Sequence, residues 1–208
     1  SAATRPGSAE ESDATEAGLV QSEVYPLVLF SLLGMLVFTS ASSLVTLFVA
    51  LEVLSLPLYV LTGLARRRRL LSQEASLKYF LLGAFASAFF LFGMALLYGY
   101  AGSFTLADIN AAISNPVYGT GLLFVGMVML AIGLLFKLGA VPFQSWVPDV
   151  YVGAPTPVTG FMAVCTKLAA VGGTARIFFV ALGAERWSWQ PMLAVVAVAT
   201  MAVGAILA

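Results

Sequence analysis

Three charged side chains lie within long apolar stretches of the sequence, where water cannot solvate them. Glu52 stands in VALEVLSLPLYV, Lys137 in LLFKLGAVPF and Lys167 in AVCTKLAAV. A charge at the centre of a bilayer costs about 2.5–3.5 kcal/mol on insertion scales, so such residues pair or face a polar interior. A buried lysine can also gain or lose a proton when a carboxylate partner moves. The residue types therefore predict a proton-loading site at Lys137, with Glu52 as a modulating partner and Lys167 as the next acceptor.

A second interpretation of the same charges is a static buried ion pair between Glu52 and Lys137 that fixes the packing of two helices. Buried pairs add little net stability but can specify one arrangement. Charge placement alone leaves both interpretations open, with proton or ion movement the favoured one. Lys78 is a weaker candidate for the proton path, because it lies only a few residues from the start of its apolar stretch. Its ammonium group can reach the membrane interface by snorkelling.

The elements that position these residues must be membrane helices, because the composition suits no other environment. Apolar residues make up 61% of the 208-residue chain and charged residues 10%, whereas a soluble domain carries roughly 45–50% and 25%. The ten basic and ten acidic residues cancel, so nothing indicates nucleic-acid binding. There is no histidine, and the one cysteine, Cys165, excludes an intrachain disulfide and a CxxC site. The chain offers no obvious cofactor site.

The apolar stretches predict an all-α, polytopic transmembrane helix bundle. A helix needs about 20 apolar residues to cross about 30 Å of hydrocarbon. We therefore predict about six spans, at residues 25–41, 44–65, 74–100, 118–151, 156–182 and 190–208. The spans leave connecting segments between them, the longest of which is residues 101–117.

The remaining charges and aromatic residues indicate which parts face water. Residues 1–23 hold one arginine and five acidic residues and are interpreted as a polar, acidic loop or tail. The run Arg66 to Arg69 predicts that this end of the bundle faces the cytoplasm, and anionic lipid binding is a second interpretation of it. Trp146, Trp187 and Trp189 are interpreted as members of the interfacial aromatic belts.

The fourth predicted span is too long for one straight helix. At about 1.5 Å per residue, 118–151 would extend roughly 50 Å. It contains Gly139, Pro142 and Pro148, and an interior proline removes a helical hydrogen bond and clashes with the preceding turn. We expect a helix to about Gly139, a break near 140–143 and a short second piece. In lipid, such a break persists only where protein or a wet cavity satisfies the freed backbone groups, which points to function.

Three sequence blocks carry a family resemblance. FKLGAVPFQSWVPDVYVGAPTPVTGF, residues 136–161, resembles the signature of the antiporter-like subunits of respiratory complex I, which share ancestry with Mrp-type sodium/proton antiporter subunits. LEVLSLPLYVL (51–61) and EASLKYFLLGAFASAFFLFGMALLYG (74–99) look like the subunit N branch in bacteria, the counterpart of mitochondrial NADH dehydrogenase subunit 2. The resemblance covers about residues 24–208.

The resemblance implies an architecture of inverted five-helix repeats, each with a discontinuous helix, as in many transporters. Residues 24–183 would form the first antiporter-like repeat, and residues 184–208 the first helix of a second. The chain starts with Ser1 and ends within an apolar stretch, so we expect it to be part of a longer subunit. The implied location is the bacterial inner membrane, as a multi-pass protein among other membrane subunits of complex I and the lipid bilayer.

The resemblance also implies roles for individual residues. Glu52, Lys137 and Lys167 match the family's proton-path residues, and Lys78 matches its lysine in the EASxKY stretch. Protons would load from the cytoplasm onto Lys137 and pass to Lys167. No cofactor is implied in this chain, because NAD, FMN, iron–sulfur clusters and quinone belong to partner subunits.

One position departs from the family pattern, and two alternatives to proton pumping stay open. Relatives commonly have histidine where this chain has Gln144, which can contact water but cannot titrate. One alternative is an Mrp-type subunit that exchanges sodium for protons. The other is a structural scaffold subunit in which the pair of Glu52 and Lys137 is static.

Overall fold

The computed structural model describes residues 9–16, 23–65, 69–116 and 119–207. Helices account for most of this part of the chain, and its one β-bridge joins Ser43 to Thr105. The α-helices are α1 (Ala9–Glu16), α2 (Val24–Ser40), α3 (Leu44–Thr62), α4 (Arg69–Ala101), α5 (Leu106–Ser114), α6 (Gly121–Leu138), α7 (Trp146–Gly153), α8 (Thr156–Phe161), α9 (Lys167–Arg176) and α10 (Arg186–Leu207). The π-helical segments η1 (Met162–Thr166) and η2 (Ile177–Ala181) continue the line of α8 and α9, and a short 3-10 turn, η3 (Gly183–Glu185), precedes α10.

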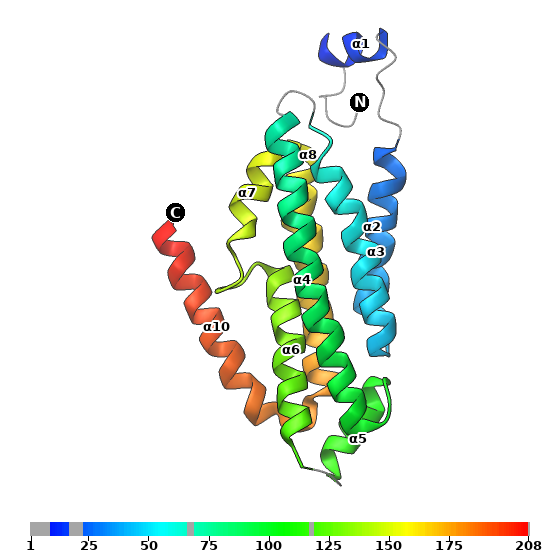
Figure 1. Ribbon diagram of the computed structural model, residues 1–208, viewed down its shortest axis with the longest axis vertical. Helices are drawn as coiled ribbons and strands as arrows, with labels where there is room; N and C mark the ends of the chain where they lie inside the picture. The colour runs from blue at the N-terminus through cyan, green and yellow to red at the C-terminus, as the bar shows by residue number, and fades with distance from the viewer. Residues whose placement is uncertain (1–8, 17–22, 66–68, 117–118, 208) are drawn as a thin grey trace.

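The long helices form an up-and-down bundle in which successive membrane-length stretches of the chain run in opposite directions (Figure 1). Five helical stretches are long and apolar enough to cross a membrane, and α2 is a shorter apolar helix beside α3. The five stretches are Leu44–Thr62, Arg69–Ala101, Gly121–Leu138, Thr156–Ala181 and Gly183–Ile206. The predicted all-α transmembrane bundle with a discontinuous helix is therefore confirmed.

Two short helices were not predicted. α5 forms where the sequence suggested a connecting loop, because Leu106, Ile109 and Ile113 recur at helical spacing and are buried against the bundle. α1 lies within the segment interpreted as an acidic tail. Of the arginine run, residues 66–68 lie outside the described residues, so its predicted orientation and lipid contact stay predictions.

Small residues allow α4 and α6 to pack closely along their length. A Cβ atom on Gly93 would lie 2.6 Å from the backbone nitrogen of Leu130, and one on Gly133 would lie 2.8 Å from the Cβ of Phe90. Close backbone approach through glycine is typical of membrane helix pairs, which lack a hydrophobic driving force between helices. α4 and α6 are therefore closely packed next to the break in the fourth predicted span.

α10 contacts the rest of the described chain at few places and extends away from the bundle in Figure 1. Trp189 in its first turns is buried and donates a hydrogen bond to the carbonyl of Leu182 at 2.8 Å. Further along, the hydroxyl of Thr200 accepts a hydrogen bond from the amide of Val141 at 3.1 Å. α10 thus reaches the break from the outside of the bundle.

Candidate functional site

The predicted helix break is present and lies between α6 and α7, midway along the bundle (Figure 1). α6 ends at Leu138, and Gly139 follows in the left-handed conformation with a φ of 69°. A Cβ atom there would lie 2.7 Å from Cγ2 of Val147 and 2.9 Å from Nζ of Lys167. Both the backbone conformation and the space therefore require glycine at this position.

Side chains satisfy the carbonyl groups that the break releases. The indole nitrogen of Trp146 donates to the carbonyl of Phe136 at 3.0 Å. The ammonium group of Lys167 donates to the carbonyl of Leu138 at 2.6 Å and lies 3.5 Å from the carbonyl oxygen of Lys137. Carbonyls at a helix C-terminus carry partial negative charge, so a lysine is well placed there. Lys167 is thus tied to the end of the helix that carries Lys137.

Lys137 is buried, with 6% of its surface exposed, and its two hydrogen-bond partners are neutral. Its ammonium group lies 2.6 Å from Oγ of Ser55 on α3 and 3.4 Å from the hydroxyl of Tyr79 on α4. The hydroxyl of Ser55 donates its own hydrogen to the carbonyl of Leu51, which leaves the oxygen free to accept from Lys137. The hydroxyl dipoles of Ser55 and Tyr79 therefore stabilise the buried ammonium group, and no carboxylate among the described residues contacts it directly.

Glu52 forms no direct ion pair with Lys137, although both residues belong to the described part of the chain. Its carboxylate instead accepts a short hydrogen bond from the hydroxyl of Ser87 on α4. Glu52 and Ser55 are three residues apart on α3, so the carboxylate lies about one helical turn from the hydroxyl that contacts Lys137. The interpretation as a directly bonded static pair is therefore wrong for this conformation. Glu52 is hydrogen-bonded to the hydroxyl of Ser87, and Lys137 is hydrogen-bonded to the hydroxyl of Ser55.

Aromatic rings separate the two lysines. Tyr79 stacks on Trp146 with ring centroids 4.8 Å apart, and Tyr59 meets Tyr79 edge-on at 4.7 Å. The ammonium group of Lys137 lies 5.5 Å from the centroid of Tyr79, and that of Lys167 lies 5.0 Å from the centroid of Trp146. Cation–π attraction acts at such distances. We call Tyr59, Tyr79 and Trp146 the aromatic cluster.

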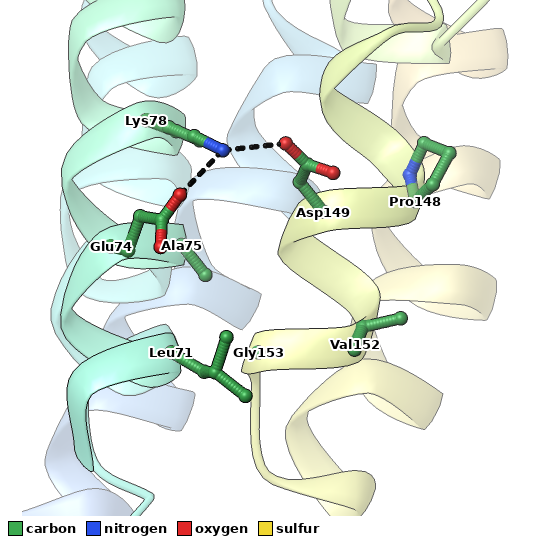
Figure 2. A pocket seen from close by; sticks show the side chains of 8 residues that line it. All are labelled: Leu71, Glu74, Ala75, Lys78, Pro148, Asp149, Val152 and Gly153. Carbon is green, nitrogen blue, oxygen red and sulfur yellow. Dashed lines mark hydrogen bonds and ion pairs between the residues drawn. The ribbon is translucent and has the colours of Figure 1, made fainter. Parts of the chain in front are cut away.

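Lys78 has a different environment from the other two lysines. Its ammonium group lies 2.7 Å from Glu74 and 2.8 Å from Asp149, and its side chain is 44% exposed. These residues line a cleft of about 200 Å³ between α4 and α7 (Figure 2). Lys78 is therefore paired by two carboxylates at the surface and is not in contact with Lys137 or Lys167.

Gln144 lies in the break itself, between α6 and α7. Its side-chain oxygen is buried and has no hydrogen-bond partner among the described residues, and the same holds for the hydroxyl groups of Tyr100 and Tyr151. Buried polar atoms in proteins are nearly always paired, with protein or with ordered water. Gln144 and Tyr151 thus provide polar atoms near the break that a water molecule can satisfy.

Ser55, Tyr79 and Ser87 contact the candidate residues directly, but the sequence alone assigns none of them to the proton path and indicates for Ser87 only a small residue facing a neighbouring helix. Ser55 had a usable signal, because it follows Glu52 by one helical turn, while Tyr79 and Ser87 had none without the contact between α3 and α4. The interpretation of Trp146 as interfacial is wrong, because it is 3% exposed and bonded to Phe136. Trp187 is 90% exposed, whereas Trp189 is buried against η2.

The described residues offer no obvious set of metal ligands. No group of three or more Cys, Asp or Glu side chains is placed there to hold a metal ion. Cys165 is a free thiol on η1. The groups gathered at the break are instead lysines, hydroxyls, an amide and a carboxylate. The lysines and the carboxylate can exchange protons with water, whereas the amide can only form hydrogen bonds.

The fold and site define a polytopic membrane protein with polar and charged residues gathered at a broken helix. Residues 41–208 match the family described as NADH:quinone oxidoreductase/Mrp antiporter, TM. The chain therefore belongs to the family of transmembrane subunits shared by NADH:quinone oxidoreductases and Mrp antiporters.

Individual relatives agree with this membership. The chain is 65% identical over 206 residues to NADH-quinone oxidoreductase subunit N of Beutenbergia cavernae, covering 99% of this chain and 39% of that protein. Among solved structures, it is similar to a chain of respiratory complex I from Thermus thermophilus, with a TM-score of 0.66, 46% identity and coverage of 76% and 35%. It is also similar to a chain of the Mrp complex from Dietzia sp., with a TM-score of 0.75, 29% identity and coverage of 87% and 33%.

Proposed function

We propose that this chain forms the proton-loading part of a subunit N-type membrane subunit of NADH–quinone oxidoreductase. It spans 39% of the length of the curated relatives whose name suggests this activity. Residues 24–183 would be the first five-helix repeat and 184–208 the start of the second. Its partners would be other membrane subunits in the bacterial inner membrane, and NAD, FMN, iron–sulfur clusters and quinone would be bound by partner subunits.

The observation that carries the proposal is the environment of Lys137 at the end of α6. The side chain is buried, its partners are neutral hydroxyl groups, and the chain direction changes two residues later. A small movement of the α6 end would therefore change how well Lys137 is solvated without breaking an ion pair. Such a site suits a group that gains and releases a proton in each cycle.

Lys167 and Glu52 extend this path on either side of Lys137. Lys167 is bonded to the backbone that follows Lys137, so the two ammonium groups share the end of one helix. Glu52 is held by Ser87 and lies one turn from Ser55 on α3, where it can act on Lys137 through space. In this proposal Glu52 modulates, Lys137 loads and Lys167 accepts, while Gln144 holds water in the break.

The test is proton pumping by the assembled complex in sealed vesicles, with Lys137→Ala in the subunit that contains this chain. We expect pumping per electron pair to fall while the complex still assembles and reduces quinone. Leu134→Ala is the matched control, because Leu134 is fully buried one turn earlier on α6 and carries no proton. A scaffold role predicts the reverse, with assembly lost and pumping per electron pair preserved in the complexes that form.

Sodium/proton exchange is the second candidate, because the Mrp chain from Dietzia sp. covers more of this fold than the complex I chain does. Sequence identity favours the first candidate, at 46% to the complex I chain against 29% to the Mrp chain. Replacing sodium by choline in the same vesicles separates the two. Unchanged pumping supports proton translocation, and loss of ion movement would support exchange.

A further inference from the structure

α7 rests on α4 through three contacts that follow one face of the helix. Trp146 stacks on Tyr79, Asp149 pairs with Lys78, and Gly153 lies against Leu71 and Ala75. Positions 146, 149 and 153 share one helical face, and their partners run in the opposite order along α4. The two helices are therefore docked in one antiparallel register.

Within this face, the pair of Lys78 and Asp149 is the one charged link between the two helices. The ammonium nitrogen and the carboxylate oxygen are 2.8 Å apart. Figure 2 shows the pair bridging the cleft. The second partner of Lys78 is Glu74, which also lies on α4. The ion pair between Lys78 and Glu74 therefore does not link α4 to another helix. On α4, Lys78 is directly followed by Tyr79. On α7, Asp149 lies one turn after Trp146.

The register has consequences for both buried lysines. Tyr79 contacts the ammonium group of Lys137, and Trp146 holds the Phe136 carbonyl and lies under Lys167. Displacing α7 along α4 would separate the ring of Trp146 from that of Tyr79. It would also remove the indole donor from the end of α6.

We propose that Lys78 and Asp149 are positioning residues, whose ion pair fixes the register of α7 on α4 and so keeps the aromatic cluster between Lys137 and Lys167. In this role Lys78 keeps its proton and carries none along the path. The proposal rests on the proposed function for its effect on pumping, but the docking of α7 can be measured separately.

The first test compares pumping per electron pair among single variants in the assembled complex. Exposed ion pairs change an equilibrium by at most about fivefold, so Lys78→Met and Asp149→Asn should each give a partial loss. Lys78→Arg should retain pumping, because arginine keeps the pair and does not release its proton. Glu74→Gln, which makes the same charge change on the same lysine within one helix, should have no effect.

The double variant Lys78→Met with Asp149→Asn should lose no more pumping than either single variant, since residues that act as one pair are not additive. Three results would overturn the proposal. They are a loss in Lys78→Arg equal to that in Lys78→Met, a loss in Glu74→Gln equal to that in Asp149→Asn, and additive losses in the double variant.

A second measurement reports docking without any reference to protons. Leu71→Cys and Val152→Cys place thiols on opposite walls of the cleft (Figure 2), in a Cys165→Ala background. The yield of cross-linking should fall when Asp149→Asn is added and stay unchanged with Glu74→Gln. If Lys137→Ala does not affect pumping, the proposed function fails, yet this cross-linking result still decides whether the pair docks α7. Equal yields in all three backgrounds would refute the docking role.

Discussion

The ammonium group of Lys167 donates a 2.6 Å hydrogen bond to the carbonyl of Leu138, the residue that follows Lys137. One lysine thus binds the end of the helix that carries the other lysine. Because helix C-terminal carbonyls attract cations, a shift of the α6 end changes the surroundings of both ammonium groups at once. Under the proposed function, the break is where backbone movement would change the proton affinity of the two lysines.

Lys167 bonds the backbone at the end of α6, and the proposed function adds a proton-accepting role that can be tested separately. Lys167→Leu should deprive the Leu138 carbonyl of its side-chain donor, at a cost of up to about 1–3 kcal/mol, and should lower the melting temperature of the purified complex as well as pumping. Lys167→Gln retains a donor and should recover most of the thermal stability but not the pumping. Full pumping by Lys167→Gln would contradict a proton-carrying role for this side chain.

Ser55 is predicted to matter for proton transfer because it is the nearest partner of Lys137. Hydrogen bonds to charged groups contribute about 1.5–3 kcal/mol, so Ser55→Ala should slow pumping about tenfold or more if this step limits the rate. The measurement is the initial pumping rate in vesicles at saturating NADH.

Ser72→Ala is the control for that experiment. Ser72 is a fully buried serine that bonds the carbonyl of Thr62 and has no contact with Lys137. It should reduce thermal stability and leave the pumping rate of assembled complexes unchanged. Equal slowing by both variants would show that any buried serine at the α3–α4 contact has this effect.

Much of the fold could be predicted from the sequence because membrane helices need only length and apolar composition. Gly139, Pro142 and the excessive length of one stretch located the break, and the rarity of charge identified Glu52, Lys137 and Lys167. These signals are local. A single sequence carries them without any knowledge of which helices are neighbours.

The partners of those residues could not be predicted in the same way. Serine and tyrosine are common in membrane helices, so Ser55 and Tyr79 stand out only once α3, α4 and α6 are placed together. The direct ion pair of Glu52 with Lys137, the less favoured of the two interpretations left open by the sequence, is not formed, because Glu52 accepts from Ser87 and Lys137 donates to Ser55. The opposite charges of Glu52 and Lys137 suggested a contact, but the positions of their side chains on neighbouring helices determine which groups they bond.

The close approach of α4 and α6 predicts a strong size dependence at Gly93. A valine there would place its Cβ against the backbone of α6, 2.6 Å from the nitrogen of Leu130, and overpacking typically costs about 1–3 kcal/mol. Gly93→Val should therefore lower the amount of assembled complex in the membrane. Gly99→Val, on the same helix but 3.8 Å from a single methyl group of Leu122, should assemble normally. Equal amounts of the two variants would refute close packing at this contact.

Gln144 tests whether the break needs a titrating group or only a hydrogen-bonding one. Its side-chain oxygen is buried without a partner in the part of the chain that the structure describes, so water is the expected partner. Gln144→Leu should lower pumping per electron pair, because it removes the polar atom that holds this water. Gln144→His should preserve pumping, since imidazole bonds water as the amide does. Normal pumping by Gln144→Leu would remove this side chain from the path, whereas faster pumping by Gln144→His would show that a titrating group at this position adds a step that the glutamine lacks.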